Sequence, residues 1–144
     1  METLNEPATR LLFTFIDFLD HREKAFLHLP EHPTIQVTKE PSLKTDDGPG
    51  FVFGIGALLD TVPPKYEMYM KFLVIDRRKY PKLRPTTIAY VLEYRDDYNE
   101  VVSTTAHFEG SEVVVDNLLL QKFLSRFAHS WLIEIDIAGY LQTK

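Results

Sequence analysis

A long run of strand-like sequence lies between two segments with helical spacing, and this order constrains the fold more than any other feature of the chain. Residues 34–108 contain stretches in which apolar and polar side chains alternate, separated by turns rich in Pro, Gly and Asp. Strands grouped in one run, with helices only outside it, are typical of an α+β domain. We therefore predict a four- to five-stranded antiparallel meander, with an N-terminal and a C-terminal helix packed on one face of the sheet.

The first helix is indicated by apolar residues at helical spacing, namely Leu11, Leu12, Phe15, Phe18, Leu19 and Phe26. Asn5 can cap its N-terminus, because the side-chain oxygen of Asn accepts a hydrogen bond from a first-turn N–H. Pro30 and Pro33 cannot continue a helix, so we predict that it ends near Leu29.

The second helix is predicted to start after Asp116, which can serve as its cap. Its apolar residues are Leu120, Phe123, Leu124, Phe127 and Trp131. Residues 131–138 also alternate as a strand would, but no turn signal appears before Gly139, so continuation of the helix is favoured.

Five segments of the central run are predicted to be strands: 34–39, 51–59, 67–75, 87–94 and 101–108. Gly54 and Gly56 would share one face of the second of these segments. Because glycine has no side chain, another group can approach that face closely.

Composition limits both the class of protein and its location. A chain of 144 residues is near the usual size of one domain, and we expect residues 1–144 to form a single one. The lack of cysteine excludes disulfides and thiolate chemistry and favours a reducing compartment, so we expect a cytoplasmic protein. The first six residues carry two acids and no base, unlike a secretory leader, and residues 11–19 are too short and polar to span a bilayer.

No motif in the sequence points to catalysis. The Gly54-Ile55-Gly56 stretch lacks the third glycine and the following helix of a dinucleotide-binding fingerprint. Ser103, Thr105 and His107 would share a strand face, but neighbours two apart on a strand are poorly placed to hydrogen-bond. We therefore expect a protein that is not an enzyme.

No cofactor or metal is expected either. Asp17 and His21 are four residues apart on one helix face, a spacing that can support a metal ion. Zinc sites, however, usually need three or four nitrogen or sulfur ligands, and this chain supplies no thiolate.

The charge is distributed unevenly, and this is the strongest functional signal in the sequence. Six bases and one acid lie between Lys71 and Arg84, whereas the whole chain has 16 bases, 21 acids and a net charge of −5. The candidate partner-binding residues of this loop are Arg77, Arg78, Lys79, Tyr80, Lys82 and Arg84. Such a cluster can dock the acidic surface of another protein, can hold nucleic acid, or can pair with the chain's own acids.

The leading hypothesis is a small non-enzymatic interaction protein, such as an adaptor, inhibitor or accessory protein. Its expected partner is a protein with an acidic surface; a nucleic-acid-associated role through residues 77–84 is one alternative, and no membrane is expected. A second alternative is a small-ligand pocket between sheet and helix. That pocket would be lined by Met68, Met70, Phe72, Tyr90 and Tyr94.

Overall fold

The structure is a computed structural model that describes residues 1–40, 43–45, 48–79, 82, 87–110 and 112–142. Its elements follow the predicted α+β order, and all strands pair antiparallel. In chain order they are α1 (Glu6–Leu19), β1 (Lys24–Leu27), β2 (Thr34–Lys39), β3 (Leu43–Thr45), β4 (Gly48–Leu59), β5 (Lys65–Asp76), β6 (Thr87–Asp96), β7 (Val101–Thr104), β8 (Ala106–Glu109), β9 (Glu112–Val115) and α2 (Leu118–Ala138).

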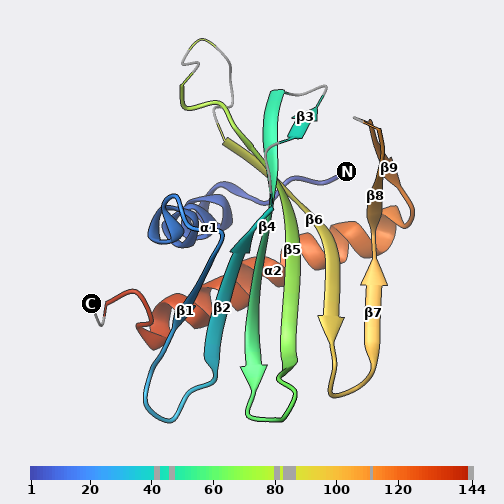
Figure 1. The fold of residues 1–144 in the computed structure, drawn as a ribbon. Helices are drawn as coiled ribbons and strands as arrows, with labels where there is room; N and C mark the ends of the chain where they lie inside the picture. Colours follow the sequence, from blue (N-terminus) through green and yellow to red (C-terminus); the bar gives the residue numbers. More distant parts are fainter. Residues whose placement is uncertain (41–42, 46–47, 80–81, 83–86, 111, 143–144) are drawn as a thin grey trace.

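The main sheet is a meander, because its strands lie side by side in the order β1-β2-β4-β5-β6-β7 (Figure 1). The short strand β3 pairs with the start of β4, and β8 pairs with β9 in a separate hairpin. The predicted fold class is therefore confirmed, while the number of strands is larger than the four to five expected.

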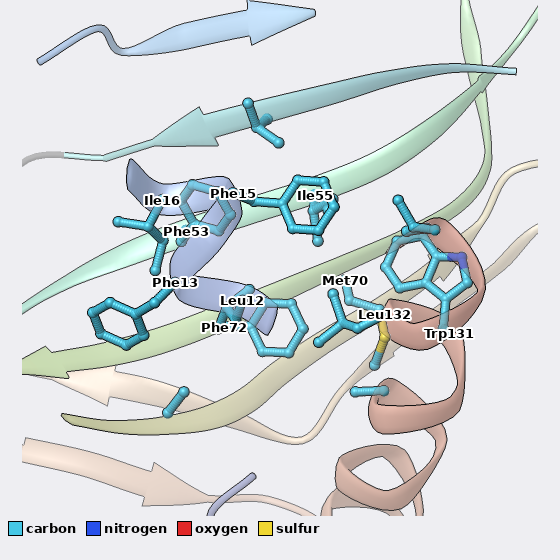
Figure 2. Packing of buried hydrophobic residues seen from close by; sticks show 14 of the residues in the cluster. Leu12, Phe13, Phe15, Ile16, Phe53, Ile55, Met70, Phe72, Trp131 and Leu132 are labelled. Atoms are coloured by element: carbon cyan, nitrogen blue, oxygen red, sulfur yellow. The ribbon is translucent and has the colours of Figure 1, made fainter. Parts of the chain in front are cut away.

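Both helices cover the same face of the sheet, as predicted, and the main core lies between the two layers. Figure 2 shows Phe15 of α1 beside Phe53 and Ile55 of β4, and Leu132 of α2 near Met70 of β5. The helices also contact one another: the Asn5 amide donates to Nδ1 of His129 across 3.0 Å. A smaller apolar cluster lies on the opposite face, where β8 and β9 contribute side chains.

The first helix is shorter than predicted, and this corrects the end near Leu29. It stops at Leu19, where Asp20 takes a positive φ of 57° and the Arg22 side chain donates to the carbonyls of Phe18 and Leu19. The five residues that follow Leu19 are all polar, so a longer helix would have no apolar side chain to bury there. The chain instead forms β1, which pairs with β2 and leaves Phe26 exposed.

The predicted strand 101–108 is broken at Thr105. The buried Thr105 hydroxyl lies 2.9 and 3.0 Å from the carbonyl oxygens of Val91 and Leu92, and its N–H donates to Leu92. Nearer the start of β6, the N–H of Leu4 donates to the carbonyl of Ala89. The outer edge of β6 is therefore occupied in turn by β7, Thr105 and the N-terminal segment.

The caps of the helices are asparagines. Asn5 accepts from the N–H of Ala8 at 2.9 Å, as predicted. The cap of α2 is Asn117 rather than Asp116, with its Oδ1 3.0 Å from the N–H of Leu120. The favoured helical continuation over 131–138 is confirmed, and α2 ends at Gly139, whose φ is 93°.

A bulge in β5 explains the two glycines of β4. Ala57 pairs with Met68 and Leu58 with Tyr66, so Glu67 is an extra residue. Tyr66 and Tyr69 consequently lie on one face, with their ring centroids 4.8 Å apart. The rings lie across Gly54 and Gly56, where an added Cβ would be 2.4 Å from the Tyr69 hydroxyl and 2.6 Å from the Tyr66 ring respectively.

We expect Gly56→Ala to destabilise the protein by about 1–3 kcal/mol, because the new methyl group must displace the Tyr66 ring. Urea denaturation of Gly56→Ala, Tyr66→Ala and the double variant measures the coupling. The double variant should lose clearly less than the sum of the single losses. Additive losses would show that the ring is not the obstacle.

Candidate functional site

The basic loop is only partly the surface cluster that the sequence suggested. Arg78, Lys79 and Lys82 are exposed and Arg77 is half-buried, while Tyr80 and Arg84 lie outside the described residues. Arg78 is held by its own domain: its guanidinium contacts Asp76 at 2.9 Å and Asp17 at 3.4 Å. Use of this loop for partner binding therefore stays a prediction.

Arg78 connects the end of β5 with α1 through side-chain contacts. Its guanidinium carbon lies 4.7 Å from the centre of the Phe13 ring. Burial raises the pKa of Asp76, but the hydrogen bonds from Arg78 outweigh this effect and hold the pKa below its ordinary value. These contacts indicate a structural role for Arg78.

Charge reversal should distinguish Arg78, which is exposed but paired within its own domain, from the exposed Lys82. Arg78→Glu breaks the contacts with Asp76, Asp17 and Phe13, so we expect a loss of about 1 kcal/mol in the free energy of unfolding. Lys82→Glu, the matched control, should change it by less than about 0.5 kcal/mol. Equal urea midpoints for the two variants would contradict this assignment.

Of the five residues expected to line a ligand pocket, the structure brings Met68 and Tyr94 together in one pocket and places the other three elsewhere. Met70 and Phe72 are fully buried in the main core. Met68 and Tyr94 lie at the margin of that core, partly buried. Tyr90 packs against the cluster on the opposite face of the sheet.

A second bulge separates the two tyrosines of β6. Lys71 pairs with Glu93 and Phe72 with Val91, so Leu92 is the extra residue. Strict alternation would place Tyr90 and Tyr94 on the same face, but one extra residue between them reverses the faces.

The residues weighed for nucleophilic catalysis have other partners. The Thr105 hydroxyl is directed to backbone carbonyls, as described above. His107 lies 2.8 Å from a carboxylate oxygen of Asp116 and 3.2 Å from one of Glu109. These hydrogen bonds, that with Asp116 first, raise the pKa of His107 above its ordinary value.

The hydrogen bonds of His107 make the stability of the folded protein depend on pH, and the direction follows from its raised pKa. A raised pKa in the folded state stabilises the protein below the unfolded pKa, and this contribution is lost as pH rises through the folded value. An NMR titration should therefore place the pKa of His107 above that of an unstructured His. Asp116→Asn should lower it, and an unchanged value in that variant would refute the pairing.

The residues considered for a metal site are also engaged separately. Asp17 contacts Arg78, while the fully exposed side chain of His21, just beyond α1, lies 3.6 Å from Asp20. Within the described part of the chain, no three His, Asp or Glu side chains are placed to hold a metal ion together.

The sequence reasoning missed an apolar flank of α2. Leu119 and Phe123 are 82% and 63% exposed, although the helix buries Leu124, Ala128 and Leu132 on its other side. The rings of Phe123 and Phe127 are stacked with centroids 6.5 Å apart, and Phe127 meets Tyr94 edge-on. Among the described helices none is long and apolar enough to cross a membrane.

A signal for this flank was present in the sequence. Leu119, Phe123 and Phe127 are spaced four residues apart, and at 100° per residue each step moves 40° around the helix. A row with this spacing runs obliquely around the helix, so part of it lies outside the buried apolar face. Treating every apolar residue as core concealed the flank.

Two pockets share part of β5: the first is lined by β4, β5, β6 and the turn after β6, and the second by residues of α2 as well as of the sheet. The Tyr94 pocket, about 380 Å³, is lined by Leu59, Glu67, Met68, Tyr94, Asp96, Tyr98 and Asn99. The Trp131 pocket, about 230 Å³, is lined by His32, Pro33, Ile35, Ala57, Glu67, Met68, Trp131, Glu134, Ile135, Ala138 and Tyr140. Glu67 and Met68 belong to both, so the pockets adjoin. We call the two pockets together with Leu119, Phe123 and Phe127 the α2 shoulder.

A broader hollow of about 880 Å³ lies between the β1–β2 and β4–β5 turns. Many of its lining residues, including Phe26, His28 and Asp60, are themselves exposed. The α2 shoulder is the better candidate despite its smaller volume, because Trp131, Ile135 and other buried side chains form its walls and can desolvate an apolar group.

Comparison with known proteins found no match among protein families, curated proteins or solved structures. Its function is therefore argued from the geometry described above. The α2 shoulder is the part of that geometry with the clearest capacity to bind.

Proposed function

We propose that this protein is a non-enzymatic interaction protein that binds another protein through the α2 shoulder. The observation that carries the proposal is the exposed row of Leu119 and Phe123, which continues through Phe127 to Tyr94. Single exposed apolar residues are normal on a protein surface, but a contiguous group beside pockets is typical of a binding site.

The energetics support the same surface. Covering apolar area contributes about 25 cal/mol per Å², and aromatic side chains are frequent among the residues that dominate binding. Phe123 and Tyr94 are already held by contact with Phe127, so little side-chain entropy is lost when a partner covers them.

This proposal keeps the predicted class of protein and changes the surface. The basic loop is a weaker candidate because Arg78, one of its bases, is engaged within the domain. An acidic partner or nucleic acid at residues 77–84, and a cytoplasmic location, remain predictions. The small-ligand alternative also remains, since the Tyr94 pocket lies within the usual size of ligand sites, about 300–1,000 Å³.

Site-specific photo-crosslinking in the native cells tests the proposal. A benzophenone amino acid at position 123 should give an adduct with another protein, whereas the same group at Arg10, exposed on α1, should not. Leu119→Ser should abolish the adduct and leave the urea midpoint nearly unchanged, because Leu119 is 82% exposed.

Three results would count against this function: no adduct at position 123, equal adducts at both positions, or an adduct that Leu119→Ser leaves intact. If a small molecule then raised the melting temperature of the protein, and Met68→Glu abolished the shift, the ligand-pocket alternative would replace it.

A further inference from the structure

We infer that the segment bound by the α2 shoulder is a basic amphipathic helix of another protein. This inference rests on the proposed function and names its partner. Three observations carry it: the shape of the uncovered surface, the position of its pockets and the sign of its charges.

The uncovered surface could accommodate one more helix. α2 crosses behind the sheet obliquely, and the lower ends of β4, β5 and β6 extend past it (Figure 1). Met68 and Tyr94 face the helix layer on those ends and are only partly covered. Because α1 and α2 pack on this face, a helix beside α2 would continue the existing layer.

The pockets define the length and the pattern of such a helix. From Leu119 to Ile135 the shoulder follows α2 for about 24 Å, at 1.5 Å per residue, which corresponds to a partner helix of about 16 residues. Apolar side chains at positions i, i+3 or i+4, and i+7 share one face of a helix. They would enter the Tyr94 and Trp131 pockets in succession.

The charges that line the pockets are negative, whereas Lys122 and Arg126 stand beside Phe123 and Phe127 at the other end of the shoulder. Glu67 lines both pockets, Asp96 lines the Tyr94 pocket and Glu134 lines the Trp131 pocket. Neither described lining includes a Lys or Arg. Glu67 and Glu134 are exposed and form no ion pair with any described base. A partner with Lys or Arg on the flanks of its apolar face would complement these carboxylates.

The position of Glu134 near the end of α2 supplies a further reason for a basic partner. Glu134 and Asp136 lie within its last five residues, and its last turn has no base. Carboxylates are unfavourable there, because the C-terminal end of a helix carries a partial negative charge. Lys or Arg side chains from a partner would offset this repulsion.

The same charges argue against a second copy of the chain as the occupant. Each copy would present pockets whose described linings hold carboxylates and neither Lys nor Arg, so the pockets of a second copy offer these carboxylates no base. The chain also carries a net charge of −5, which adds to the repulsion.

Selection from a peptide library tests the inference. The probe is a phage library of 16-residue peptides with leucines at helical spacing and Lys, Glu, Gln or Ser at all other positions. The wild-type chain should select Lys-rich peptides, and Glu67→Lys/Glu134→Lys should select Glu-rich ones. Glu23→Lys/Glu112→Lys changes the net charge equally at exposed sites outside the shoulder and should select as the wild type does.

A synthetic copy of a selected Lys-rich peptide should bind at least about tenfold more weakly to Glu67→Lys/Glu134→Lys and to Phe123→Ser. No enrichment, or enrichment without a charge bias, would overturn the inference. If position 123 still formed its crosslink, the proposed function would stand; without that crosslink, both would fall. A dimer that Phe123→Ser dissociates would identify a second copy as the occupant and would also overturn the inference.

Discussion

One buried residue, Thr105, joins the sheet to the start of α2. Thr105 donates to the carbonyls of Val91 and Leu92 at the bulge of β6, and its own carbonyl accepts from the N–H groups of Asp116 and Asn117. A bulge leaves backbone groups unpaired, and buried unpaired groups are costly, so the hydroxyl satisfies a need that the strand itself creates. Because Asn117 caps α2, its hydrogen bond to Thr105 fixes where the long helix begins to cross the sheet.

The two flanks of α2 differ in how far the rest of the chain covers them. On one flank the backbone of Glu2 exchanges hydrogen bonds of 2.8 Å with the buried side chain of Gln121, and Ser125 adds a third contact to its carbonyl. That network covers polar groups that would otherwise be buried without partners. On the other flank Leu119 and Phe123 have no such cover among the described residues, and this difference is the basis of the proposed binding surface.

The parts of the fold that could be predicted are those set by local sequence. Asn5 and the spacing of the apolar residues specify α1, and alternation specifies the strands of the meander. The bulges at Glu67 and Leu92 could not be foreseen, because neither contains Gly or Pro and each is defined by its partner strand. They decide which side chains share a face, and so the pocket predicted from alternation was dispersed. The contact of Arg78 with Asp17 spans 61 residues of sequence and was equally hidden.

The occupied outer edge of β6 has a consequence for how this protein can be recognised. Along that strand β7, Thr105 and Leu4 take up the outward backbone groups in succession, and β7 itself has only four residues. Another chain therefore finds few free backbone N–H and C=O groups to pair with there. This also limits uncontrolled growth of the sheet into aggregates. Recognition on this side of the molecule is thereby left to side chains, whose shape and charge discriminate between partners more sharply than a backbone edge does.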